Sequence, residues 1–170
     1  PSAQNSAAAS GYWVLGIDGG VFAFGSAPFY GSMTGKLNGA SAIAIAATNS
    51  GNGYYVLTST GGLFTFGDAQ VYGSMGGTPL NAPIIGMATT PSGNGYWLLA
   101  KDGGVFSFGD AQFYGSTGGM RLNAPILSMA TAPKGNGYWL IGRDGGVFSF
   151  NVPFYGSIPG IGLCKPPVGT

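Results

Sequence analysis

The side chains that carry most enzyme chemistry are nearly absent from this sequence. None of the 170 residues is histidine or glutamate, and the acidic residues are five aspartates. Without histidine the chain cannot form a Ser-His-Asp triad, a Cys-His pair or a histidine-ligated metal site. The chemistry that remains is that of paired carboxylates, which hydrolyse a glycosidic bond when two of them flank it.

The aspartates occupy two kinds of turn. Asp18, Asp102 and Asp144 each precede Gly-Gly, while Asp68 and Asp110 each stand in a Gly-Asp-Ala sequence. At such positions an aspartate accepts backbone hydrogen bonds within its own turn. No clustered Asp/Asn loop of the calcium-binding type accompanies them. We therefore expect all five to form turns, and we expect no catalytic residue, no metal site, no cofactor and no enzymatic activity.

A second set of residues has the chemistry to bind a ligand without transforming it. A sugar ring needs a flat aromatic face for its C–H groups and amide groups for its hydroxyls. The residues that fit this role are Trp13, Trp97, Trp139, Tyr72, Tyr114, Asn81 and Asn123. The competing interpretation is structural, because repeated aromatics among apolar residues form a core and Asn in Leu-Asn-Ala-Pro forms an ordinary turn. The residue types favour the structural interpretation and leave the binding one open.

These residues recur because the chain is a tandem repeat. The sequence Gly-Tyr-Trp or Gly-Tyr-Tyr begins at Gly11, Gly53, Gly95 and Gly137, a step of about 42 residues. Each time, a Gly-Gly turn, a pair of phenylalanines and a Tyr-Gly-Ser segment follow in the same order. A period of this length is typical of the blades of a β-propeller.

Each repeat predicts four short strands. In the fourth repeat we expect them at 126–131, 138–141, 147–150 and 154–157, with a tight turn at Asp144-Gly145-Gly146. Residues 138–141 are apolar on both faces of the strand, which requires a covering layer on each side. The predicted fold is therefore all-β, a four-bladed β-propeller with four antiparallel strands per blade. We expect a linker at 1–10, one domain at 11–164 with repeats at 11–37, 38–80, 81–122 and 123–164, and a tail at 165–170.

The ring of blades needs one more strand than the repeats supply. The innermost strand carries a small residue at its centre, Ala44, Gly86 or Ser128, but the first repeat has no such strand. Ile161-Gly162-Leu163 repeats the pattern near the C-terminus, so we expect it to complete the first blade and close the ring, which removes free sheet edges. The rival architecture is an open half-ring that pairs with a second chain to give eight blades.

Composition limits the partners and the location. Lysine and arginine total six and are scattered, for a net charge of +1, so we expect no nucleic acid partner. No apolar run reaches the roughly 18 residues that would span a membrane. Cys164 is the only cysteine, so no internal disulfide is possible. Charged residues at 6% and 34 glycines favour a secreted or cell-surface protein, and the start at Pro1 predicts a processed or excised chain.

The third repeat also carries a family resemblance. Its motifs are Gly95-Tyr96-Trp97-Leu98-Leu99, the Asp-Gly-Gly-Val-Phe-Ser-Phe-Gly-Asp-Ala run at 102–111 and Phe-Tyr-Gly-Ser-Thr-Gly at 113–118. They resemble a propeller-like repeat of secreted proteins from high-GC Gram-positive bacteria, where the repeats often stand beside hydrolase or cell-wall domains. The hairpins are more distantly similar to those of tectonin-type propeller lectins. The resemblance covers about residues 11–158 and implies a secreted propeller with a targeting or adhesive role.

The predicted function is a non-catalytic, secreted, lectin-like module that binds cell-wall or polysaccharide glycans through grooves between blades. Weak sites repeated on several blades would act together through avidity. The alternative is a structural or assembly protein, a surface-layer, fibre or spacer domain whose partners are proteins or further copies of itself. The low charge suits both functions.

Overall fold

Each repeat folds into one small antiparallel sheet. The computed structural model describes residues 10–161, in which eleven strands form four sheets. The first sheet has two strands, β1 (Gly11–Leu15) and β2 (Val21–Gly25). The second sheet comprises β3 (Ala42–Ala47), β4 (Gly53–Thr58) and β5 (Leu63–Gly67). The third comprises β6 (Ile84–Thr89), β7 (Gly95–Ala100) and β8 (Val105–Gly109). The fourth comprises β9 (Ile126–Thr131), β10 (Tyr138–Gly142) and β11 (Val147–Phe150), and a 3-10 turn, η1 (Ile158–Ile161), follows it.

The hairpin turns are those that the sequence predicts. Asp18, Asp102 and Asp144 each accept the backbone N–H two residues later, at 3.0, 2.9 and 3.0 Å. The intervening glycine has a positive φ, 80° at Gly103 for example, which a side chain would disfavour. The prediction that these three aspartates form turns is confirmed.

The predicted fourth strand of each repeat does not form. Residues 29–32, 71–74, 113–116 and 154–157, called here the Tyr-Gly-Ser segments, belong to no strand. Their glycines have φ values of 139° at Gly31 and 144° at Gly73, outside the β region of side-chain-bearing residues. The Tyr30 N–H and the Gly31 carbonyl both bond to the hydroxyl of Tyr54 in the next sheet. The prediction of four strands per blade is therefore wrong, because the segment bonds to a neighbouring side chain and not to a strand.

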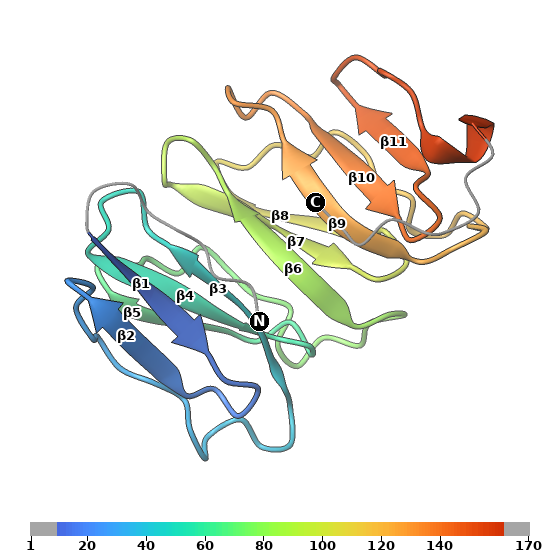
Figure 1. Cartoon of the computed structure of the whole chain (residues 1–170). Coiled ribbons are helices and arrows are strands. Elements are labelled where there is room, and N and C mark those ends of the chain that lie inside the picture. Colours follow the sequence, from blue (N-terminus) through green and yellow to red (C-terminus); the bar gives the residue numbers. More distant parts are fainter. Residues whose placement is uncertain (1–9, 162–170) are drawn as a thin grey trace.

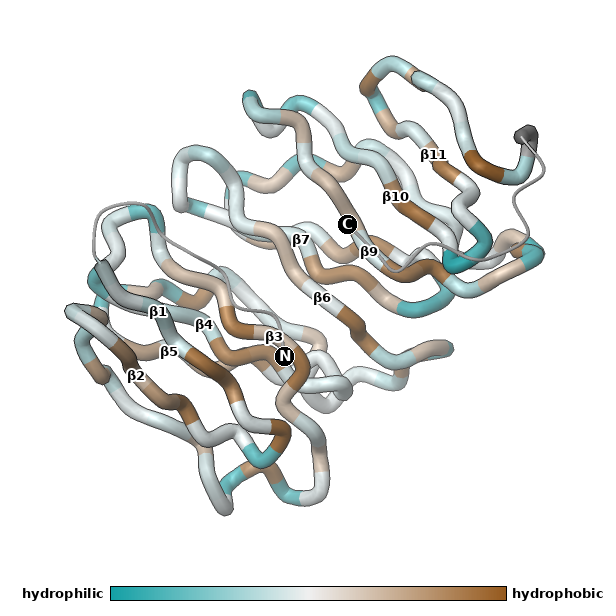
Figure 2. Tube along the Cα trace, in the orientation of Figure 1, coloured by the Kyte–Doolittle hydropathy of each residue, from teal (hydrophilic) through white to brown (hydrophobic). Residues whose placement is uncertain are grey.

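Neighbouring sheets cover both faces of the central strands. All six residues of β4 and all six of β7 are buried. In β10, where the apolar residues 138–141 predicted a covering layer on each side, Trp139 is only half-buried. Hydrophobic residues accordingly follow the strands, and hydrophilic ones gather in the connecting loops (Figure 2). In the first sheet β1 is covered on one face only, since Trp13 is buried while Tyr12 is exposed.

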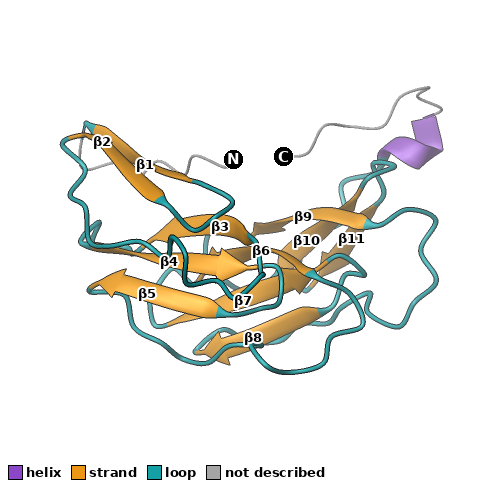
Figure 3. Cartoon of the chain, turned by 90° about the horizontal axis from the view of Figure 1, so that it is seen from below, coloured by secondary structure: helices purple, strands orange, loops and turns teal. Residues whose placement is uncertain are grey.

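The four sheets follow one another along an arc. Its concave side carries β3, β6 and β9, the first sheet lies at one end and the fourth at the other (Figures 1 and 3). These inner strands contact one another in order, β3 with β6 and β6 with β9. Ala44, Gly86 and Ser128 line a hollow of about 180 Å³ between them. The prediction of an inner strand with a small central residue is confirmed for three sheets.

The arc is open among residues 10–161, and no sheet there is closed. Ile161 ends the 3-10 turn, and the rest of the predicted closing strand, together with Cys164, lies outside the described residues. The linker expected at 1–10 lies outside them too, except for Ser10. No helix in the described part of the chain is long and apolar enough to cross a membrane.

Candidate functional site

One aromatic junction joins each sheet to the next. In the second, third and fourth sheets the first tyrosine of the middle strand is fully buried: Tyr54, Tyr96 and Tyr138. Its ring packs against an aromatic of the preceding sheet. The ring centroids are 5.3 Å apart for Trp13 and Tyr54, 5.5 Å for Tyr55 and Tyr96, and 6.0 Å for Trp97 and Tyr138.

The tyrosine hydroxyl ties this junction to a Tyr-Gly-Ser segment. Tyr96 donates to the Gly73 carbonyl at 2.5 Å and accepts the N–H groups of Tyr72 and Gly73 at 3.0 and 3.1 Å. Tyr54 and Tyr138 donate to the equivalent carbonyls at 2.6 Å. Burial raises the pKa of all three tyrosines above the ordinary value, and the backbone N–H groups that bond to the phenolate form lower it by less.

Alkaline pH is expected to unfold the protein through these tyrosines. Below the ordinary tyrosine pKa, about 10, these tyrosines are protonated in both the folded and the unfolded chain. Their contribution to the free energy of unfolding is therefore constant in this range of pH. At higher pH the unfolded chain loses protons that the folded chain retains, so the free energy of unfolding falls as the pH rises through the folded pKa. Urea midpoints measured from about pH 8 to about pH 11 should fall above pH 10 and less steeply for Tyr96→Phe. A midpoint that stays constant over this range contradicts the assignment.

The predicted aromatic platform is mostly core. Trp13 and Trp97 are buried, and the Trp97 indole N–H donates to the Gln112 carbonyl at 2.7 Å. Neither has an exposed ring face to offer a sugar. Trp139, on the last sheet, is half-buried and donates to the Pro153 carbonyl at 2.9 Å. Trp13 and Trp97 therefore belong to the core, because both rings are buried where neighbouring sheets pack together.

Tyr114 lies in a polar groove between the third and fourth sheets. The groove has a volume of about 250 Å³, and Gln112, Lys134 and Asn136 line it with Tyr114. The Tyr114 hydroxyl donates to the Gly135 carbonyl at 3.1 Å and lies 3.4 Å from Gln112 Oε1, which holds the half-buried ring at the groove wall. Lys134 and Asn136 are exposed, and neither side chain bonds to any residue in the range 10–161.

Asp110 also lines this groove. Its carboxylate accepts hydrogen bonds from Thr90 Oγ1 at 2.8 Å and Ser92 Oγ at 2.5 Å. Asp68 does the same for Thr48 and Ser50, at 2.8 and 2.5 Å. Each aspartate thus ties the turn after the third strand of its sheet to the turn between the first two.

The other predicted ligand residues do not converge on the groove. Tyr72 occupies the equivalent position between the second and third sheets, where its hydroxyl lies 3.4 Å from Asn94 Oδ1. Asn81 lines a separate hollow of about 400 Å³ between those two sheets, whose one carboxylate, Asp102, is engaged in its own turn. Asn123 is exposed on the connection before β9 and lines neither cavity.

Sequence reasoning missed Lys134 and Asn136. One signal was present, because Lys134 stands where the second and third repeats have Ser50 and Ser92. The charged residue in place of serine distinguishes the groove between the third and fourth sheets from the equivalent groove between the second and third. Neither the comparison with models of protein families nor the search of curated proteins finds a match to this sequence.

Proposed function

We propose that this protein is a secreted, non-catalytic recognition module whose four sheets act as the blades of a β-propeller. Its ligand is a glycan of a cell wall or polysaccharide, bound in the groove between the third and fourth sheets. The observation that carries the proposal is the set of side chains in that groove: the Tyr114 ring beside the Lys134 ammonium and the Asn136 amide, neither of which has a partner among residues 10–161. Secretion is proposed from the low charge and from the family resemblance.

The groove has the donors and acceptors that sugar hydroxyls require. Lysine offers three donors, while asparagine and glutamine each offer two donors and an acceptor. These groups converge beside the Tyr114 ring, which its own hydroxyl holds in place, so the ring itself loses little side-chain entropy when a ligand binds. A shallow groove of this kind suits one or two sugar residues of a longer chain.

Repetition compensates for the weakness of one shallow site. Between the second and third sheets Gln70, Tyr72 and Asn94 recur at the same repeat positions, with Ser92 in place of Lys134. A polymeric glycan that reaches two grooves gains affinity from the effective concentration of the second site. The engaged carboxylates of Asp68 and Asp110 support a role in binding without catalysis.

Binding to glycans tests the proposal. The purified chain is expected to bind insoluble polysaccharide or bacterial cell walls, and a soluble competitor from a glycan array should release it. Lys134→Ala with Asn136→Ala should weaken retention about tenfold or more, as the loss of two ligand hydrogen bonds predicts. Lys101→Ala changes an exposed lysine outside the groove and should have no effect. Equal retention of the groove variant and the Lys101 control would refute the assignment of this groove.

A second candidate function is that of a structural or assembly protein. The observation that favours it is a set of aromatic side chains left exposed at the two ends of the arc, on the first sheet and on the segment that follows the last sheet. A chain that binds no glycan but forms assemblies would have this function instead.

A further inference from the structure

The first sheet exposes an aromatic surface, called here the head face. It consists of Tyr12, Phe22 and Phe24, which are 47, 57 and 47% exposed. The rings of Tyr12 and Phe24 stack with centroids 5.3 Å apart, and no hydrogen bond joins the Tyr12 hydroxyl to another residue in the range 10–161. Large aromatics grouped on one exposed face mark an interaction site.

The other three sheets bury the same surface. Tyr12 is equivalent to the fully buried Tyr54, Tyr96 and Tyr138, and its partner Phe24 is equivalent to Phe66, Phe108 and Phe150. In each later sheet the preceding sheet covers this pair with its Trp or Tyr and its Tyr-Gly-Ser segment. The head face is therefore half of a junction that the molecule forms three times.

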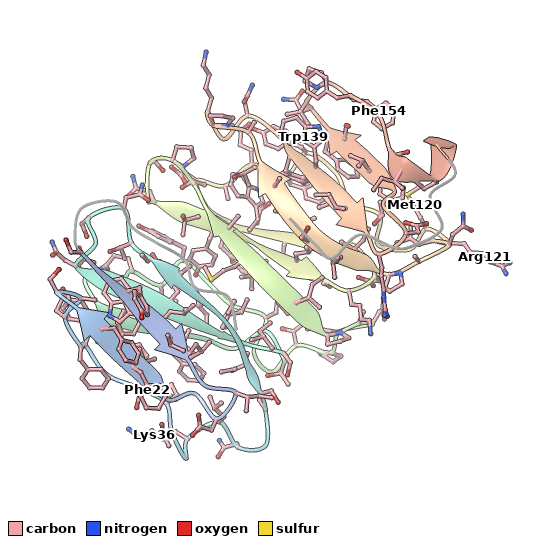
Figure 4. The ribbon with its side chains drawn as sticks, in the orientation of Figure 1. Phe22, Lys36, Met120, Arg121, Trp139 and Phe154 are labelled. Atoms are coloured by element: carbon pink, nitrogen blue, oxygen red, sulfur yellow. The ribbon has the colours of Figure 1, made fainter. Side chains whose placement is uncertain are left out.

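The last sheet exposes the complementary half, called here the tail face. It consists of Trp139, Tyr155 and Gly156. Tyr155 is 83% exposed, whereas its equivalents Tyr30, Tyr72 and Tyr114 are half-buried in the junctions. Trp139 and Phe22, which belong to the tail and head faces, lie at opposite ends of the molecule (Figure 4).

Gly156 shows what the tail face is shaped to receive. At Gly31, Gly73 and Gly115 a Cβ atom would overlap the ring of Phe66, Phe108 or Phe150, so in those junctions the glycine makes room for a phenylalanine. Gly156 has a similar φ, 122° against 131° at Gly115, but nothing lies within 4 Å of its Cβ position. This place fits Phe24 of a first sheet.

We propose that a second copy of this chain covers both end faces. The first sheet of each copy packs against the last sheet of the other, with Phe24 over Gly156 and the Tyr12 hydroxyl on the Gly156 carbonyl. The two complementary faces lie at opposite ends of an open arc, where they do not contact each other (Figures 1 and 3). A second copy of the chain supplies the matching face at each end. Two copies related by a twofold axis form two identical junctions and leave no end face over, so assembly stops at a closed ring of eight blades.

The junction is also chemically suited to copies of itself. It is formed by neutral aromatic and backbone groups, and the net charge of +1 per chain produces little repulsion between two copies. Buried aromatic anchors dominate the energy of protein interfaces. The inference goes beyond glycan binding, since it concerns surfaces outside the groove.

Complementation between two broken variants tests this arrangement. Phe24→Asp breaks the head face and Gly156→Val blocks the tail face. Wild-type mass, measured by sedimentation or light scattering, should rise with concentration to that of two chains. The dissociation constant of each variant alone should be about 30-fold or more above that of the wild type, because both junctions of its dimer lose an interface anchor. Mixed together, the variants should form a two-chain species, because the intact tail of one meets the intact head of the other.

The matched control is Phe113→Asp, which changes a phenylalanine that is 59% exposed but belongs to neither end face, and it should associate like the wild type. The mixture also controls for folding, since a misfolded variant could not complement. A wild-type chain that stays single at all concentrations would overturn the proposal and favour closure by the chain itself. Masses that grow beyond two chains, or a mixture that fails to associate, would overturn it as well. Glycan binding by the groove can fail or succeed independently of these outcomes.

Discussion

Tyr96→Ala is expected to lower the free energy of unfolding by about 3–5 kcal/mol, the range for truncation of a large buried aromatic. The Tyr96 ring is fully buried between the second and third sheets, 5.5 Å from Tyr55 and 5.6 Å from Phe108. The substitution leaves a cavity and removes the hydroxyl to which Tyr72 and Gly73 bond, so partly buried backbone groups lose their partner. Urea denaturation followed by tryptophan fluorescence measures the change.

Tyr12→Ala is the matched control, because Tyr12 holds the same repeat position at the exposed head face. It should cost about 1 kcal/mol or less when measured at protein concentrations too low for association. Both variants lose the intrinsic preference of tyrosine for a strand, so the difference between their free energies of unfolding measures the contribution of the junction. Equal losses for the two variants would mean that the junctions do not hold the sheets together.

Gly115→Ala is expected to be the next most damaging of these substitutions. A Cβ atom there would lie 2.5 Å from the Phe150 ring, which is packed against Tyr138 and cannot withdraw freely. The φ of 131° adds strain for any side chain. Overpacking of this kind costs about 1–3 kcal/mol in addition to the strain.

Gly156→Ala isolates the packing contribution. Its φ of 122° is close to that of Gly115, so the backbone strain is similar, but no atom lies within 4 Å of the new Cβ. At low protein concentration the free energy of unfolding of Gly156→Ala should therefore exceed that of Gly115→Ala by about 1–3 kcal/mol. If the two variants are equally stable, the Phe150 ring moves to accommodate the new methyl group, and glycine is required at position 115 for its φ alone.

Both pairs of variants examine the same junction, once where a neighbouring sheet completes it and once where none does. The dimer proposal depends on this equivalence. If Tyr96→Ala and Gly115→Ala behave as expected, the contacts that hold neighbouring sheets together within one chain are also available at the head and tail faces, where they must offset the translational and rotational entropy lost on association. A chain with stable internal junctions would then have a measurable tendency to form the same junction with a second copy.

Much of the local structure was predictable from the residues. The tandem repeat predicted three of the strands in a repeat, since β9, β10 and β11 begin and end within one residue of the predicted bounds. The turn role of Asp18 followed from its place before Gly-Gly, because that hydrogen bond closes within a few residues. Burial on both faces of β4 and β7 followed from the four consecutive apolar residues at the centre of each strand, 54–57 and 96–99.

The tertiary structure alone decided the roles of residues whose partners lie in another repeat. The Tyr-Gly-Ser segment has strand-forming residues, yet its carbonyl bonds to a buried tyrosine about 23 residues further along, a contact that no local pattern encodes. Trp97 became core and Tyr114 a groove wall for the same reason, because each depends on how the neighbouring sheet packs.

The sequence by itself determined an all-β chain of repeated hairpins with few groups capable of catalysis, since strand period, turn chemistry and residue inventory are local properties. Packing between sheets decided which aromatics are buried, where the groove with Lys134 opens, and that no sheet formed by residues 10–161 covers the two ends of the arc. The sequence of one repeat does not indicate whether its sheet lies at the end of the arc or between two other sheets. Tyr12 and Tyr96 belong to the same motif, and only the presence or absence of a preceding sheet makes one a surface and the other a core.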